Sequence, residues 1–364
     1  MEKYSKVNSH SHLLPYPEQI PAFMKKKEVF WIDDDRKYMR QKGWQRPITD
    51  PSFFKDEKLE WMAKYDINHA VILTLSQLYC NGVEADLCCD VQKFQNDFNA
   101  SLQQEHPDKF TAGFVVQPAH LDNALKEIER CVEKLGLSIL CLPTHFPDGS
   151  EEWRSISDPV AEPIFELANK YGIAIEIHPY DAPKMVKLRD NFWRFHLVWM
   201  CAQTADAYHM FTLRDFPRKY PNIRTAFAHG NQFGQINVGR RSQGFAGRPD
   251  LFKDAVEPRE SLAVDNVYFD SIVHDVYAFR MLADRQGKSQ IIAGLDDPYP
   301  LGEVTLDGYT SYPGKVIDDA VDSGFIFKSD RRKIWFDNVL NWIGGKRAIE
   351  VSDLLITKNE SNAI

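Results

Sequence analysis

The chain has 364 residues, and its 44 Lys and Arg residues against 52 Asp and Glu residues give a formal charge of −8 at pH 7. With 43% hydrophobic and 26% charged residues, its composition is that of an ordinary globular protein. The acidic balance and the lack of a long Lys/Arg run argue against a nucleic-acid partner or an anionic membrane surface.

Neither a membrane span nor a signal peptide is expected, because no segment reaches about 18 apolar residues and MEKYSKVNSHSH lacks an apolar stretch. The cysteines show no CxxC spacing, and a chain of this length does not need disulfides to stabilise its core. We therefore expect a cytoplasmic protein with reduced thiols at Cys80, Cys88, Cys89, Cys131, Cys141 and Cys201.

Eight short segments rich in apolar and β-branched residues predict strands at Lys6–His10, His69–Thr74, Thr111–Val116, Leu137–Leu142, Ile173–Ile177, Arg224–Ala228, Val267–Asp270 and Gln290–Gly294. Apolar residues three or four apart predict helices at Leu59–Tyr65, Val91–Gln104, Leu121–Leu135, Val160–Tyr171, Ala205–Tyr220 and Val276–Ala283. This alternation favours an α/β fold with a parallel sheet that closes as a (β/α)8 TIM barrel. A doubly wound open sheet is the alternative, but it would place a Gly-rich turn where the chain reads HSHLLP.

A single barrel domain is expected over residues 1–350, since barrels use about 250 or more residues for one domain. Residues 13–52 form a long insertion after the first strand, in which VFWI and KYMR flank Asp33-Asp34-Asp35 as in a β-hairpin. Such an insertion would be a lid over the barrel mouth. Residues 351–364 are polar and are expected to form a C-terminal tail that packs outside the barrel or frays.

Ligand-capable side chains lie at the ends of four predicted strands. His10 and His12 end the first strand, and because strand side chains alternate, both imidazoles point to the same side. The fifth, sixth and eighth strands end at His178, His229 and Asp296. One such histidine would be an ordinary hydrogen-bonded residue, but strand ends of a barrel meet at one face. The pattern therefore predicts a metal centre.

Three imidazoles with one carboxylate suit Zn(II), although Mn, Fe and Co bind such sets as well. We expect His10, His12, His178 and Asp296 to bind the ion, and His229 to move a proton beside the water bound to it. The fourth strand ends in Leu142-Pro143-Thr144-His145 and offers no lysine to bridge a second metal. The centre should therefore hold one ion, and no organic cofactor is expected.

The chain resembles the amidohydrolase superfamily, and within it the metal-dependent decarboxylases. The resemblance extends from His10 to about Ile343, and its specific parts are HSHLLP, HPYD at His178–Asp181, AHG at Ala228–Gly230 and GLDDPYPLGE at Gly294–Glu303. It implies zinc on the same four side chains, with His229 activating the zinc-bound water. It also implies a substrate carboxylate bound by Arg46, a second arginine, Arg240, supplied across a homodimer interface, and the aromatic Trp193 near the substrate.

From the residues alone, Arg46 in the lid could grip a carboxylate with its planar guanidinium or form a surface ion pair. Three arginines follow the sixth strand, and they could form a solvated surface or bind an anion: Arg240, Arg241 and Arg248. The spacing of Trp193 is that of a core residue as much as that of a residue on which a ligand stacks. Structural roles are expected for His145, His196 and His274, although His145 could face the pocket.

The chain departs from the resembled family at two places near the site. The turn after the sixth strand is His229-Gly230-Asn231-Gln232-Phe233 instead of a glycine run, and Leu295 and Asp297 flank Asp296 where the family has serine and tyrosine. Such changes leave the ligands intact, but we expect them to alter the shape and polarity of the pocket.

The expected reaction is a non-oxidative decarboxylation of a small unsaturated or aromatic carboxylate. The metal and a proton donor would take up the electron pair left by CO2: His229 would deprotonate the metal-bound water, the hydroxide would add to the conjugated substrate, and the imidazolium would return the proton as CO2 leaves. Two other functions remain open. One is hydrolysis or hydration of a small carboxylated substrate with the same metal, and the other is a non-catalytic barrel that binds a metabolite. Only decarboxylation releases CO2.

Overall fold

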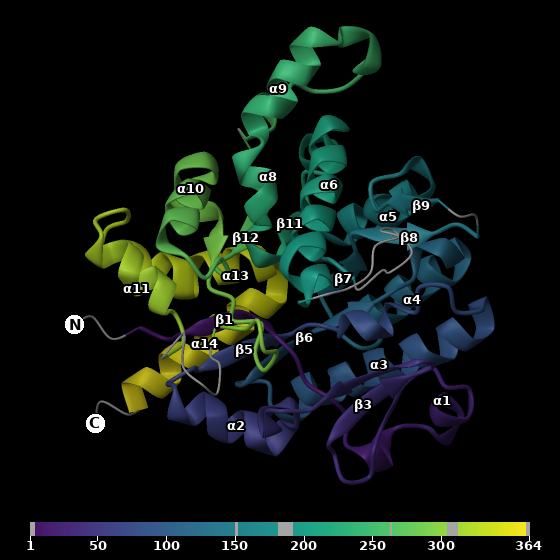
Figure 1. Ribbon diagram of the computed structural model, residues 1–364. Coiled ribbons are helices and arrows are strands. Elements are labelled where there is room, and N and C mark those ends of the chain that lie inside the picture. Colours follow the sequence, from purple (N-terminus) through teal and green to yellow (C-terminus); the bar gives the residue numbers. More distant parts are fainter. Residues whose placement is uncertain (1–3, 150–151, 181–191, 263, 304–311, 362–364) are drawn as a thin grey trace.

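The computed structural model describes residues 4–149, 152–180, 192–262, 264–303 and 312–361 (Figure 1). Eight parallel strands form one sheet in the order β1-β5-β6-β7-β10-β11-β12-β13. Their bounds are β1 Val7–Ser11, β5 His69–Ile72, β6 Phe110–Val115, β7 Ile139–Pro143, β10 Ala174–His178, β11 Arg224–Phe227, β12 Val267–Asp270 and β13 Ile291–Ile292. Each predicted strand is present, with ends shifted by at most two residues.

The sheet curves until its first and last strands meet. Backbone hydrogen bonds connect Ser9 N to Ala293 O (2.7 Å) and His12 N to Asp297 O (2.9 Å), and a parallel bridge pairs Ser11 with Asp297. The prediction of a (β/α)8 TIM barrel is confirmed, because the eight strands alternate with helices and nearly close the ring.

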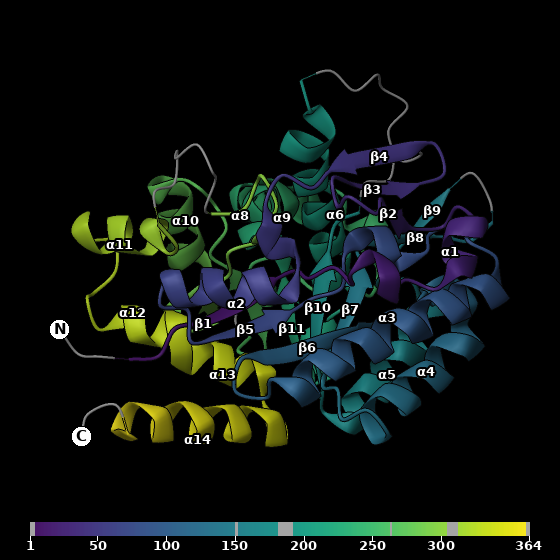
Figure 2. The same cartoon turned by 90° about the horizontal axis from the view of Figure 1, so that it is seen from below.

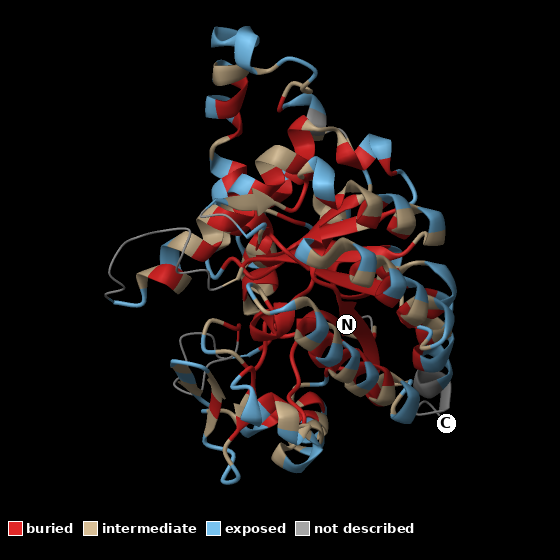
Figure 3. Ribbon diagram, turned by 90° about the vertical axis from the view of Figure 1, so that its right-hand side faces the viewer, coloured by how far each residue is buried: buried red, intermediate tan, exposed pale blue. Residues whose placement is uncertain are grey.

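Helices surround the barrel, and the buried residues concentrate in the strands and on the inward helix faces (Figure 3). The surrounding helices are α2 Lys55–Lys64, α3 Ala85–Glu105, α4 Leu121–Glu133, α5 Glu162–Tyr171, α6 Met200–Leu213, α7 Phe216–Lys219, α10 Val276–Gln286, α11 Lys315–Asp322 and α12 Asp330–Arg332. The predicted helix Ala205–Tyr220 is split in two, because Asp215 adopts a positive φ of 54° and Pro217 begins a new turn.

The insertion after β1 contains α1 Ala22–Lys26 and a three-stranded antiparallel sheet of β2 Trp31–Ile32, β3 Tyr38–Gln41 and β4 Trp44–Pro47. The predicted hairpin is β2–β3, in which Ile32 pairs with Met39. Strand β4 was not predicted, since it lacks alternating apolar residues, and a turn at Gly43 with φ of 69° leads into it. Figure 2 shows this sheet beside the barrel.

The C-terminal segment differs from the expected tail. Helix α14 runs from Gly345 to Ser361 without a break at residue 351, and both Val351 and Leu355 are buried. They pack with α13 Asn338–Ile343 against residues from the amino ends of the barrel strands, such as Val7. Of the two expected alternatives, packing outside the barrel is therefore the one that the structure shows, because two apolar side chains one helical turn apart anchor the helix.

Two further features follow strands of the barrel. The hairpin of β8 His145–Pro147 and β9 Trp153–Ser155 follows β7, and helices α8 Gln232–Ile236 and α9 Val238–Gly247 follow β11. Figure 1 shows α9 extending away from the barrel. No described helix is both long and apolar enough to cross a membrane, and all six cysteines are free.

Candidate metal centre and active site

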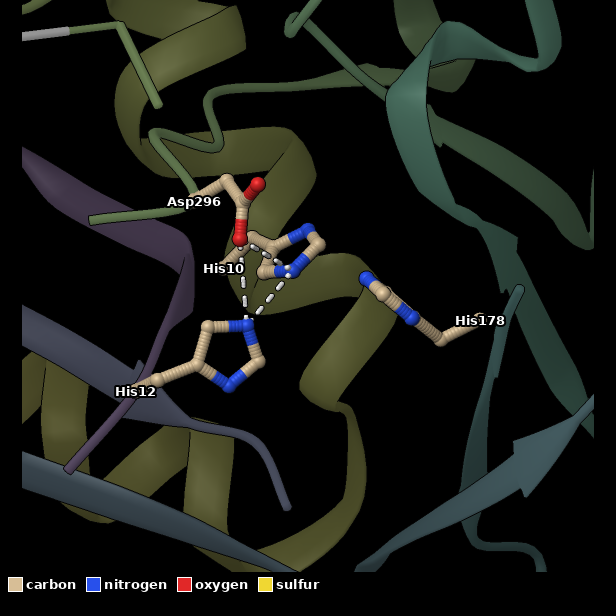
Figure 4. Close-up of side chains that lie close together, drawn as sticks. All are labelled: His10, His12, His178 and Asp296. Atoms are coloured by element: carbon tan, nitrogen blue, oxygen red, sulfur yellow. Dashed lines mark hydrogen bonds and ion pairs between the residues drawn. The ribbon is translucent and has the colours of Figure 1, made fainter. Parts of the chain in front are cut away.

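The four predicted metal ligands meet at the carboxyl end of the barrel. The ligand atoms of His10, His12, His178 and Asp296 all lie within 4.8 Å of one another, and the four residues are buried. His10 Nε2 lies 3.1 Å from His12 Nε2, and His12 Nε2 lies 3.2 Å from Asp296 Oδ1. Figure 4 shows the imidazoles and the carboxylate converging on a common point, with His178 opposite the other three.

A second interaction fixes each imidazole with its Nε2 toward this point. His10 Nδ1 lies 2.9 Å from Asp270 Oδ2, His12 Nδ1 lies 3.1 Å from Leu73 O, and His178 Nδ1 lies 2.6 Å from Pro179 O. Metal-bound histidines are held in the same way. Among the described residues, His178 Nε2 has no hydrogen-bond partner although it is buried. A buried, orphaned nitrogen beside a carboxylate fits a divalent metal ion.

The protonation of the cluster follows from burial and from the carboxylates. Burial holds the pKa of His178 well below its usual value, and burial also lowers the pKa of His12. For His10, burial works in the same direction, but the hydrogen bond to Asp270 and the charge of Asp296 raise its pKa to about 9. Burial also opposes the charge of Asp296, yet its contacts with His12 and His229 keep its pKa well below the usual range.

His229 lies beside the metal centre, at the end of β11, with Nε2 3.7 Å from Asp296 Oδ2. Its backbone has a positive φ of 57° and begins a left-handed turn through Gly230 and Asn231. The carboxylate of Asp270 holds this turn, because it accepts hydrogen bonds from His229 N and Gly230 N, both at 2.9 Å. A valine side chain lies where a Cβ on Gly230 would be, so this position needs glycine.

A cavity of about 220 Å³ opens over these residues. Arg46 from β4 and Trp193 both line it, together with His178, His229 and Asp296. The Arg46 guanidinium contacts His196 Nε2, and Trp193 stacks on the His196 ring at a centroid distance of 4.8 Å. Among the described residues, Arg46 has no carboxylate partner. The insertion thus brings a cation to the mouth of the cavity.

Other predicted residues lie elsewhere. Arg240 is exposed on α9 and is not part of the wall of this cavity. His145 does not face it either, because its Nε2 lies 2.8 Å from Asp206 on α6. In contrast, His196 and His274 line the cavity, although structural roles were expected for them. Asp181, the last residue of HPYD, lies outside the described residues.

The departures in sequence affect the cavity less than expected. Gln232 lines it, but Asn231 is buried against Gly234, and neither Leu295 nor Asp297 reaches the cavity wall. Leu295 is part of the hydrophobic core, and Asp297 forms a buried ion pair with Lys58. Gln232 is therefore the departure that changes the polarity of the cavity wall, and Leu295 and Asp297 are not part of that wall.

Sequence reasoning missed two carboxylates. Asp270 is the last residue of β12, and it contacts both His10 and the turn at His229. Its position as a polar residue at a strand end is the feature of the sequence that could have indicated this role. Glu176 precedes His178 by two residues on β10 and so faces the same side of the strand. Both Glu176 oxygens lack a hydrogen-bond partner among the described residues, and burial raises its pKa to about 8.

Two curated proteins, both decarboxylases, are similar to this chain over most of its length. A 2-amino-3-carboxymuconate-6-semialdehyde decarboxylase of Dictyostelium discoideum is 25% identical over 349 residues, which cover 93% of this chain and 91% of that one. One of Caenorhabditis elegans is 23% identical, covering 87% of this chain and 89% of that one.

Solved structures share the fold. A 5-carboxyvanillate decarboxylase from Sphingomonas paucimobilis superposes with a TM-score of 0.72 at 16% identity, covering 93% of this chain and 98% of that one. A dihydroxybenzoic acid decarboxylase from Polaromonas with bound manganese gives a TM-score of 0.69 at 13% identity, covering 95% and 99%. The family model described as amidohydrolase matches residues 7–309, so this chain, with its metal centre at the carboxyl end of the barrel, belongs to the amidohydrolase family.

Proposed function

We propose that the protein is a metal-dependent decarboxylase of a small unsaturated or aromatic carboxylate, and that the ion is a single zinc. One observation carries this proposal: His178 and Asp296 of the metal-binding set, the neighbouring His229, and Arg46, which has no carboxylate partner among the described residues, line one cavity. Both curated relatives and several similar structures are decarboxylases. The His3Asp set suits zinc, and the structure from Polaromonas with manganese indicates that a related barrel accepts another divalent ion.

The residues of the cavity match the needs of the reaction. A divalent ion on the four ligands would act as a Lewis acid that stabilises negative charge on the substrate. Arg46 would bind a substrate carboxylate through two parallel hydrogen bonds and so fix its position. As the bond to CO2 breaks, the electron pair stays on carbon, and His229 Nε2 would supply the proton that replaces CO2 there.

We also propose that the chain acts as a cytoplasmic homodimer. The position of Arg240 on the projecting helix α9, away from its own catalytic cavity, supports a role for this arginine at the cavity of a second copy. The free cysteines agree with a reducing compartment.

The test is CO2 release, with product mass, from zinc-reconstituted protein given 2-amino-3-carboxymuconate 6-semialdehyde and a panel of hydroxybenzoates and muconates. We expect CO2 and a product lighter by that mass from at least one acid, and complete loss of turnover when a chelator removes the metal. A product formed without CO2 would instead indicate hydrolysis or hydration, and no product from metal-loaded protein would contradict catalysis on these acids.

The role of His229 has its own test. His229→Ala should keep its metal but lose at least about 100-fold in turnover, since general acid–base groups contribute that much. His106→Ala is the matched control, because the His106 ring packs on Phe110 at the amino end of β6, which is the end of the barrel opposite the site. Equal turnover of the His229 variant and the wild type would remove this residue from the reaction.

A further inference from the structure

A second cavity, of about 440 Å³, adjoins the catalytic one. Helices α6, α8 and α9 form its walls, and Phe233 of α8 lines both cavities. Its lining residues are Ala202, Ala205, Asp206, His209, Phe233, Asn237, Arg240, Arg241, Gly244 and Phe252. The proposed decarboxylation uses none of these side chains within the same chain.

Arg241 is the unusual member of this lining. Its side chain is only 7% exposed, and its Nε and Nη1 have no hydrogen-bond partner among the described residues. Nη2 donates to Gly234 O at 3.2 Å, and the guanidinium lies 5.2 Å from the centre of the Tyr208 ring. Burial lowers the pKa of Arg241, and no carboxylate opposes that effect. A buried cation left in this state is costly unless an anion pairs with it.

A second buried arginine, Arg347, has the carboxylate partner that Arg241 lacks. Arg347 is equally buried, but it lies 3.3 Å from a carboxylate oxygen of Glu350 and donates to the carbonyl oxygens of Pro107 and Phe110. In the second cavity the acidic lining residue is Asp206, whose carboxylate already accepts a hydrogen bond from His145 at 2.8 Å. The guanidinium of Arg241 therefore lacks the counter-ion that Arg347 has.

The surroundings define the chemistry of the missing partner. His209 Nδ1, also in this lining, is buried without a partner among the described residues. Phe233 and Phe252 supply apolar surface on either side. The unpaired N–H groups of the Arg241 guanidinium, beside an aromatic wall, are suited to a carboxylate attached to a flat, apolar body.

We propose that the second cavity is a carboxylate-binding site, separate from the catalytic cavity, in which Arg241 holds the carboxylate and the two phenylalanines contact the rest of the ligand. The carboxylate belongs either to a free aromatic acid or to an acidic side chain of a second copy of this chain. Both sources satisfy the same unpaired N–H groups of Arg241.

Binding of 4-fluorobenzoate to the zinc-loaded protein, followed by fluorine NMR, tests the proposal. Two sites should appear in the wild type. Arg241→Met should raise the Kd of one site by at least about tenfold and leave the Kd of the other site unchanged. Arg46→Met should raise the Kd of that other site and leave the first unchanged. Arg241→Lys, which keeps the charge, should retain part of the affinity and guards against a variant that fails to fold.

Sedimentation of the same proteins distinguishes the two sources. If a second copy fills the cavity, the wild type will bind the probe only at the site that depends on Arg46, and Arg241→Met will dissociate at concentrations where the wild type stays associated. The proposal is overturned if Arg241→Met matches the wild type both in probe binding and in sedimentation. A lower Tm with both properties unchanged would make Arg241 a purely structural residue, which also overturns it.

Discussion

At the scale of single residues, Asp270 orients His10 and the turn at His229, although it is not one of the four predicted metal ligands. One of its oxygens lies 2.9 Å from His10 Nδ1 and also accepts from His229 N, and the other accepts from Gly230 N. We predict that Asp270→Asn lowers zinc affinity about 10–100-fold, because the neutral amide orients His10 without raising its basicity. Competition with a chromophoric chelator measures this affinity.

Asp275→Asn is the matched control for this experiment. Asp275 caps α10 by accepting from Tyr277 N and Ala278 N, and asparagine caps helices about as well. Its zinc affinity should therefore equal that of the wild type. Should Asp270→Asn also bind zinc as the wild type does, the carboxylate has no influence on the ligand set.

Arg46 is the residue that we expect to determine substrate binding. If its guanidinium holds a substrate carboxylate, Arg46→Met should raise KM about 10–100-fold, equivalent to about 1.4–2.7 kcal/mol, and change kcat much less. Arg40→Met is the control, because Arg40 lies on the adjacent strand β3 and is occupied by Asp33 at 2.6 Å. Steady-state kinetics of both variants on the acid that releases CO2 measures these changes. An unchanged KM for Arg46→Met would exclude the carboxylate contact.

At the scale of elements, a buried ion pair joins α2 to the segment that carries Asp296. Lys58 and Asp297 are both almost fully buried and in direct contact. Lys58 Nζ also lies 3.0 Å from Ser11 Oγ, and Asp297 accepts from Ser11 Oγ at 2.9 Å and from Asn8 Nδ2 at 2.5 Å. Since Ser11 lies between His10 and His12, this pair holds together the two segments that carry three of the four predicted metal ligands.

Removing one partner should therefore be costly. We predict that Lys58→Met lowers the free energy of unfolding by about 3–5 kcal/mol, because it leaves the Asp297 carboxylate buried and unpaired. Adding Asp297→Asn should recover most of that loss. Lys55→Met on the same helix removes only a partly exposed pair with Glu105 and should cost about 0–1 kcal/mol. Urea unfolding of the four proteins measures these differences, and equal losses for Lys58→Met and Lys55→Met would contradict the argument.

At the scale of the whole molecule, the sequence predicts the barrel and the metal-binding set because both depend on a regular pattern. Parallel strands end at one face, so ligands such as His178 and Asp296 meet there wherever the helices lie. The burial of Arg241 and the pairing of Lys58 with Asp297 could not be predicted in this way. Both features depend on distances between elements that are far apart in the chain, and a periodic sequence pattern does not predict such distances.

The pH dependence of stability is also a property of the whole fold, and His69 on β5 makes one contribution that can be isolated. Its ring is fully buried, with Nδ1 3.1 Å from Asp108 O and Nε2 2.9 Å from Thr111 Oγ1. Burial lowers its pKa to about 3. In the unfolded chain a histidine has a pKa of about 6.5, so below that pH the unfolded state binds a proton that the folded state does not bind until about pH 3.

Because the unfolded state binds more protons in this window, the contribution of His69 to stability is complete above about pH 6.5 and falls as the pH is lowered toward 3. Between pH 7 and pH 5 this loss is about 2 kcal/mol. His69→Gln does not titrate and still offers an amide to Asp108 O, so its free energy of unfolding should fall by about 2 kcal/mol less than that of the wild type over the same range. Urea unfolding at both pH values gives this difference directly, and the other titrating groups cancel because both proteins contain them. Equal losses in the two proteins would mean that His69 becomes charged inside the fold.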